Sequence, residues 1–97
     1  MGIDLSVRAA HKAVVLDVAS NKFVSPGVSF HTDPADMDRL LAIARTGASE
    51  DVRLIAVLEA TGMAWYPVSA YLSDRGVEVY RVSGQQVAGQ RRVSAVK

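Results

Sequence analysis

The first third of the chain alternates apolar and polar residues, as half-buried strands do. Alternation over residues 3–7 predicts a first strand. A β-branched apolar run over residues 13–18 predicts a second strand, and a turn then leads into a third over residues 23–30. Pro26 interrupts this third strand, which indicates a bulge or an edge position. Three consecutive strands with short turns predict an antiparallel meander.

From residue 32 the apolar period changes to that of a helix. Thr32 or Asp33 is expected to cap it, with Pro34 at its first position, and Gly47 is expected to end it. Apolar residues recur at positions i, i+3, i+4 and i+7 and form one face of the helix, made of Met37, Leu40, Leu41 and Ala44.

Strands and helices then alternate. The near-continuous apolar run over 52–58 predicts a strand buried on both faces, and residues 63–74 a helix that Gly76 ends. Residues 77–82 predict a fifth strand, and Ser83 is expected to cap a third helix. The order β-β-β-α-β-α-β-α predicts a mixed α/β sheet with helices packed on it. The meander leaves strand one with a free edge, where the crossover helix delivers strand four in parallel.

Composition limits the class of protein. The chain has 97 residues and no cysteine, which excludes a disulfide scaffold, a thiolate metal site and a cysteine nucleophile. Its longest strongly apolar stretch, 54–58, is too short to span a bilayer, so we expect no membrane partner and a cytoplasmic protein. The net charge of +1 does not by itself indicate a nucleic-acid partner. The segment 76–97 is nevertheless basic, with Glu78 as its only acid.

Two acids stand where such sheets bind ligands. Asp4 lies in strand one, and Glu59 follows strand four, at the carboxyl ends of strands that we expect to be neighbours. Neighbouring carboxylates repel each other unless a cation or protons neutralise them, and hard oxygen ligands select Mg²⁺ or Mn²⁺. A structural role is the alternative: Asp4 can pair with Arg8 or Lys12, and Glu59 can accept amides of the following helix.

Several motifs carry a resemblance to a known family. They are Gly-Ile-Asp-Leu-Ser at 2–6, Glu-Ala-Thr-Gly at 59–62, Trp-Tyr-Pro at 65–67 and Val-Tyr-Arg-Val at 79–82. The chain resembles, over essentially all its length, the N-terminal part of the DEDD transposases of bacterial insertion sequences, which are related to the pilin-gene invertases. That family is similar to the Holliday-junction resolvase RuvC and has a ribonuclease-H-like fold, and its name records four metal-binding acids.

The resemblance assigns roles to individual residues. Asp4 matches the first acid and Glu59 the second, so both are expected to be catalytic and to bind Mg²⁺ or Mn²⁺. The third and fourth acids would follow Lys97, which matches the lysine of the family's K-T-D-x-x-D-A stretch. Residues 1–97 are therefore expected to be an incomplete RuvC-like catalytic domain, truncated at its C-terminus. It would bind the metal weakly and be inactive alone, whereas the full-length protein would cleave and transfer DNA strands.

The same resemblance implies partners. DNA is the expected substrate, a guide RNA is a further candidate because the family is similar to RNA-guided recombinases, and the protein would lie at the bacterial nucleoid. Arg91, Arg92 and Lys97 are candidates for phosphate contacts, with a solvated helix face as the alternative. Apolar surface left bare by the missing helices is expected to drive self-association, most simply as a two-fold dimer.

Two other functions remain open from the sequence. An actin-like or sugar-kinase ATPase shares the opening strand, but Ser6 and the residues after it replace the small residues that cradle phosphate there. A non-catalytic nucleic-acid-binding or assembly module could also keep the fold. His11 and His31 are expected at the surface or as caps, and Trp65 in helix–sheet packing rather than base stacking.

Overall fold

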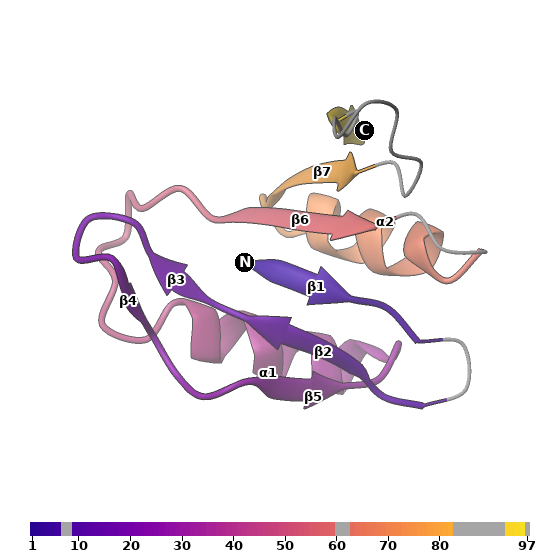
Figure 1. Ribbon diagram of the computed structural model, residues 1–97, viewed down its shortest axis with the longest axis horizontal. Helices are drawn as coiled ribbons and strands as arrows, with labels where there is room; N and C mark the ends of the chain where they lie inside the picture. Colours follow the sequence, from indigo (N-terminus) through magenta and orange to yellow (C-terminus); the bar gives the residue numbers. More distant parts are fainter. Residues whose placement is uncertain (7–8, 60–62, 83–92, 97) are drawn as a thin grey trace, which may run out of the picture.

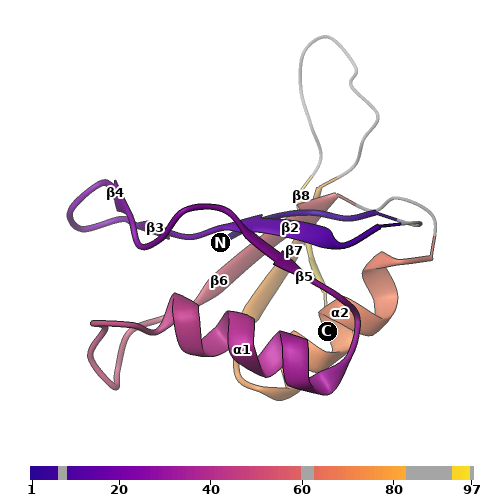
Figure 2. The same cartoon turned by 90° about the horizontal axis from the view of Figure 1, so that it is seen from below.

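A computed structural model describes residues 1–6, 9–59, 63–82 and 93–96. Within these ranges the chain forms a six-stranded mixed sheet, a separate two-stranded sheet and two helices, and both helices pack on the same side of the large sheet (Figures 1 and 2). The strand order of the large sheet is β5-β2-β1-β6-β7-β8. Its elements are β1 (Gly2–Asp4), β2 (His11–Val14), β5 (Val28–Phe30), α1 (Pro34–Ala44), β6 (Ile55–Glu59), α2 (Trp65–Asp74), β7 (Glu78–Val82) and β8 (Val93–Val96).

The meander forms as predicted, but two of its strands are broken. β2 pairs antiparallel with β1, with Ile3 opposite Ala13, and with β5 on its other side. The prediction of one continuous strand over 13–18 is wrong, because its outer part becomes β3 (Leu16–Asp17). The third strand is interrupted, as Pro26 indicated: its outer part is β4 (Lys22–Phe23), and β5 is an edge strand of the large sheet. β3 and β4 pair with each other in a hairpin that extends beyond the large sheet (Figure 1). Pro26 has no backbone N–H for a ladder, which explains the break before β5.

The parallel half of the sheet also follows the prediction. β6 runs parallel to β1 and to β7, so strand four of the sequence does lie beside strand one. The burial of Ala56 and Leu58 on β6 and of Val79 on β7 places these side chains in the core beneath the sheet. There they join fully buried residues from the helices and from β5, namely Phe30, Leu40, Val68 and Leu72.

Local sequence signals set the limits of the helices. The carboxylate of Asp33 caps α1 by accepting a hydrogen bond from the Asp36 amide at 2.9 Å, and Pro34 begins the helix. The four predicted apolar residues of α1 are all buried. α2 begins at Trp65, two residues later than expected, and Gly76 follows it with a φ of +83°, a conformation that favours glycine. No helix in the described ranges is long and apolar enough to cross a membrane.

The last predicted element is wrong where the structure describes it. The start of the expected third helix at Ser83 lies outside the described residues, but Val93–Val96 form β8, antiparallel to β7, with Val82 opposite Val93. The free edge of β7 offers backbone groups for pairing, and β-branched valines at both ends of the segment favour a strand. Gly84 and Gly89 lower the helix propensity before it. The predicted mixed sheet is therefore observed, and the described residues 93–96 form a strand instead of the end of a helix.

Candidate active site

Asp4 and Glu59 lie side by side at one edge of the sheet. β1, β6 and β7 are parallel, so their carboxyl ends meet at the same edge, and Asp4 and Glu59 are the last residues of β1 and β6. Gly2 stands opposite Val57 and Ile3 opposite Leu58. One further step along this register brings Asp4 level with Glu59.

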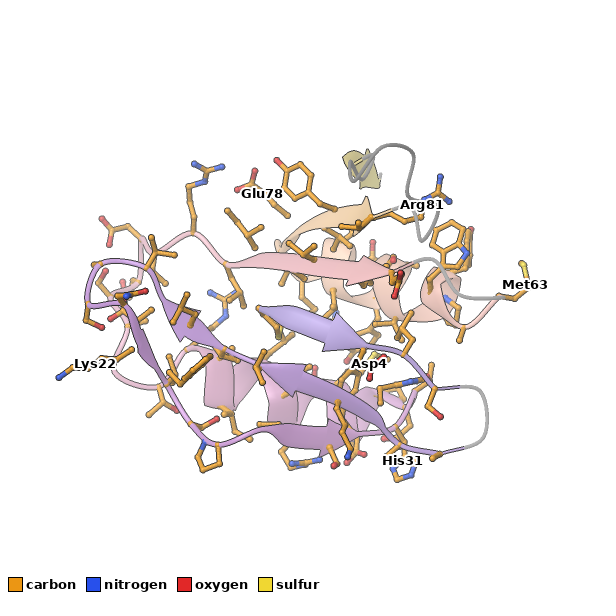
Figure 3. All side chains as sticks on the ribbon, viewed as in Figure 1. Asp4, Lys22, His31, Met63, Glu78 and Arg81 are labelled. Carbon is orange, nitrogen blue, oxygen red and sulfur yellow. The ribbon has the colours of Figure 1, made fainter. Side chains whose placement is uncertain are left out.

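Both acids face the side of the sheet that the helices leave uncovered. Ile3 and Leu58 are buried on the helix side, and because side chains alternate along a strand, the next residue of each strand points the other way. Figure 3 views this uncovered side and shows Asp4 near the tip of β1. Asp4 and Glu59 line a shallow hollow there together with Lys12, Val57 and Val82. Adjacent acids on one open surface can contact a ligand together.

Lys12 is a candidate for a structural partner of Asp4. It is the register partner of Asp4 across β1 and β2 and lines the same hollow. Among the described residues no ion pair joins Lys12 to Asp4. Arg8, the other cation proposed for Asp4, lies outside the described residues.

The donor set of the hollow suits a hard divalent cation. It offers carboxylate oxygens, which Mg²⁺ and Mn²⁺ prefer, and none of the soft ligands that select other metals. In the described part of the chain, no group of three or more potential metal ligands occurs. Asp4 and Glu59 can therefore supply only part of a coordination shell.

His11 holds the segment that follows β1, and of the two roles expected from the sequence, surface group or cap, it is not the surface group. It is buried, packs its ring 5.2 Å from that of Phe30, and accepts a hydrogen bond at Nδ1 from the Ser6 amide at 3.0 Å. Since Nδ1 accepts, Nε2 carries the proton and donates to Thr32 Oγ1 at 2.6 Å. Burial, with a smaller effect of nearby His31, lowers the pKa of His11. The alternation of His11 with buried Ala13 and Val15 was the sequence signal for this core position.

Two other residues considered from the sequence have structural roles. Ser6 Oγ accepts a hydrogen bond from the Ala9 amide at 3.0 Å, which links Ala9 to the end of the segment after β1. His31 is exposed, as predicted, and its Nδ1 lies 3.2 Å from the carboxylate of Asp36. The carboxylate of Asp36 also accepts the His31 amide, and this bond is the main cause of the lowered pKa of Asp36.

Trp65 packs against the core as predicted, and it also contacts Arg81, which the sequence did not indicate. The guanidinium carbon of Arg81 lies 4.6 Å from the centroid of the Trp65 ring. The neighbouring Tyr66 is 60% exposed. Trp65 and Arg81 belong to different elements, so no spacing in the sequence marks the pair.

The remaining candidate residues cannot be placed at this edge. Arg91, Arg92 and Lys97, expected to contact phosphates, lie outside the described residues. So does the rest of the motif that begins at Glu59, over residues 60–62. The described site consists of the acid pair, Lys12 and the apolar floor between them.

Comparison with known proteins agrees with the resemblance seen in the sequence motifs. The family model of the IS110-type DEDD transposases, described as transposase, matches residues 1–97. No curated protein and no solved structure matches the chain significantly. The family match extends over the whole sequence, so it includes both acids of the hollow. The chain therefore belongs to the DEDD transposase family of the IS110 type.

Proposed function

We propose that residues 1–97 form the N-terminal part of a RuvC-like catalytic domain that cleaves and transfers DNA strands with the help of a divalent metal. The observation that carries this proposal is the parallel register of β1 and β6, which brings Asp4 level with Glu59 on the uncovered side of the sheet. Family membership supports the transposase activity of the full-length protein, its use of DNA and its dependence on a divalent metal.

Asp4 and Glu59 would hold the metal, and their chemistry fits it. Mg²⁺ in proteins is often bound through one or two carboxylates and keeps several waters or phosphate oxygens as its other ligands. When bound, such an ion supplies activation of the attacking oxygen and stabilisation of the leaving oxygen in phosphoryl transfer. The other two acids of the family pattern would come from elsewhere in the protein, so we expect these 97 residues alone to bind Mg²⁺ weakly and to lack activity.

The described residues around the acid pair hold Asp4 in position. Hydrogen bonding of β1 to both β2 and β6 fixes the backbone at Asp4, and the buried His11 ties down the loop that follows. Lys12, opposite Asp4, reduces the repulsion between the two carboxylates before a metal binds. A second candidate, in which Asp4 and Lys12 form only a structural cross-strand pair, rests on the same register.

The exposed apolar residues and the family resemblance suggest two further partners, a second copy of the chain and a guide RNA. We infer that residues 1–97, taken alone, self-associate through the uncovered sheet face, where Val14 is 47% and Val57 39% exposed. A guide RNA stays a candidate on the resemblance to RNA-guided recombinases. The family match gives no support to an actin-like ATPase. A non-catalytic module of the same fold remains the alternative, and substitution of the two acids tests it.

Conservative substitution in the full-length transposase tests the proposal. Asp4→Asn and Glu59→Gln each remove one ligand charge at nearly constant volume. Each should reduce excision of a marked element in cells by about a thousandfold or more, because metal stabilisation of the transition state amounts to several kcal/mol. Asp74→Asn is the matched control, since Asp74 is exposed at the C-terminal end of α2, away from the acid pair.

The outcomes separate the two candidates. Loss of excision in both acid variants, with the control active and all three proteins folded, supports the metal site. Normal excision by either variant removes that residue from the site. Normal excision by both leaves only the structural pair of Asp4 and Lys12.

A further inference from the structure

A lysine shares the face of the sheet on which the acid pair lies. In β2, Ala13 is buried and its neighbour Lys12 is exposed. Ala13 stands opposite Ile3, which is also buried, so both point to the helix-covered side. Lys12 stands opposite Asp4 in the same ladder, and residues directly opposite each other in an antiparallel pair point to the same face. Lys12 therefore lies on the uncovered side, where it lines the hollow of the acid pair.

The lysine and the two acids form a row across three neighbouring strands. The strand order β2-β1-β6 places Lys12 beside Asp4 and Asp4 beside Glu59. Adjacent strands are about 4.8 Å apart, so Lys12 is one strand from Asp4 and two strands from Glu59. A ligand held between the two carboxylates is therefore flanked on the β2 side by the ammonium group of Lys12.

Lys12 differs from cations of the described chain that hold parts of the fold together. The guanidinium of Arg53 donates to both carboxylate oxygens of Glu78, at 2.7 and 2.9 Å. That of Arg39 donates to the Ser29 carbonyl at 2.6 Å. In the ranges that the structure describes, no ion pair includes Lys12. Its backbone is fixed between β1 and β5, while its ammonium group carries three donors on a flexible stem and can bind phosphate as a point charge.

We propose that Lys12 binds a backbone phosphate of the DNA strand that the acid pair takes up. The proposal rests on the proposed function, because it takes DNA as the substrate and a divalent cation as the ligand of the acids. Before a cation binds, the charge of Lys12 faces the Asp4 carboxylate across the ladder. Once that carboxylate is neutralised, the ammonium group can donate to a phosphate oxygen instead. This contact, one strand away from the acid pair, gives the DNA strand a second point of attachment and so fixes its direction across the hollow.

A titration of the full-length protein with Mn²⁺ in the absence of DNA is the first part of the test. Free Mn²⁺ is measured by electron paramagnetic resonance. Lys12→Gln should bind Mn²⁺ at least as tightly as the unsubstituted protein, because the substitution removes a positive charge beside the site. Asp4→Asn should bind Mn²⁺ more weakly, since it removes a ligand charge.

The second part follows the fluorescence anisotropy of a labelled DNA duplex in Mn²⁺, with a gel to confirm that the duplex stays intact. Lys12→Gln should weaken binding roughly tenfold at moderate salt, since one charge-assisted contact is lost. The slope of log K against log salt should fall in magnitude by about 0.9, the value for one phosphate. Lys12→Arg should keep most of the affinity, because it keeps the charge.

Lys22→Gln is the matched control for the loss of one positive charge. Lys22 is exposed on β4, and in Figure 3 it lies at the opposite end of the molecule from Asp4. At this separation salt screens its charge from a strand at the acid pair, so the variant should bind the duplex within about twofold of the unsubstituted protein.

Every outcome bears on the proposal. Equal DNA affinity of Lys12→Gln and the unsubstituted protein, an equal loss in Lys22→Gln, or an equal loss in Lys12→Arg would overturn it. Weaker Mn²⁺ binding by Lys12→Gln would overturn it too, because the lysine would then hold Asp4 in place for the metal. A loss confined to an RNA duplex of the same sequence would overturn the assignment to DNA. Mn²⁺ binding that does not depend on Asp4 would overturn the proposed function itself, whereas Asp4-dependent binding with an unchanged DNA affinity in Lys12→Gln would overturn only the role of Lys12.

Discussion

Acidification should destabilise the protein through His11. In the folded state Nδ1 of this buried ring accepts the Ser6 amide and Nε2 donates to Thr32, so the ring is neutral. Protonation of Nδ1 would turn the acceptor toward another donor and place a charge beside Phe30 in the core. The unfolded chain, with an ordinary histidine pKa near 6.5, meets neither cost.

The sign and size of the effect follow from linkage. Burial lowers the folded pKa of His11, so below pH 6.5 the unfolded state binds more protons than the folded state. The contribution of His11 to the free energy of unfolding is therefore fully present above pH 6.5. Below that pH the free energy of unfolding falls, by at most about 1.4 kcal/mol per pH unit for one proton. A domain of this size would lose roughly 4–8 °C in melting temperature for each kcal/mol.

Urea unfolding between pH 5 and 7 measures this slope. The lowered pKa values of Asp36 and Asp51 place their effect below this window. Burial also lowers the pKa of the Met1 amino group from 8.0, so this group adds to the slope with the same sign as His11. His11→Gln cannot protonate and should lose the His11 share of the slope, whereas the exposed His31→Gln should keep most of the slope. A free energy of unfolding that is constant from pH 7 to 5, or an equal slope in His11→Gln, would refute the reasoning.

Other predictions concern the helix ends and assembly. Asp33→Ala removes the cap of α1 and should cost about 1 kcal/mol in urea unfolding, while Asp33→Ser should cost less; equal stability of all three would contradict the capping role. Gly76→Ala should cost about 1 kcal/mol because of its positive φ, although its Cβ would meet no atom within 4 Å, and Gly76→Asn should be milder. Sedimentation equilibrium of residues 1–97 alone should show self-association that Val57→Lys, on the uncovered face, weakens; a monomer at every concentration would refute it.

The sequence predicted those parts of the fold that local signals decide. Asp33 followed by Pro34 marks a helix start whatever surrounds it, and the apolar spacing after them matches the buried face of α1. The pairing of β6 with β1 followed from element order, because the meander leaves only one free edge for a parallel strand. Pro26 indicated the interruption of the third strand and the edge position of β5. The break in the second strand was missed, because a β-branched run has the same pattern whether it pairs within one sheet or two.

The site could be predicted only as far as it depends on strand order. That order and the motifs indicated that Asp4 and Glu59 would be neighbours. The stacking of Arg81 on Trp65 depends on how α2 crosses β7, a tertiary fact that no periodicity encodes. β8 was missed for a similar reason, because the free edge of β7 favours a strand that the intrinsic propensity of residues 93–96 only allows.

An anomalous-scattering map from crystals soaked in Mn²⁺ tests the central claim most directly. The account predicts a manganese peak in the hollow, with carboxylate oxygens of both Asp4 and Glu59 within ligand distance of it, and loss of the peak in Asp4→Asn but not in Asp74→Asn crystals. A map that shows no manganese peak in the hollow, and instead shows the ammonium group of Lys12 between the two carboxylates, would contradict the metal site.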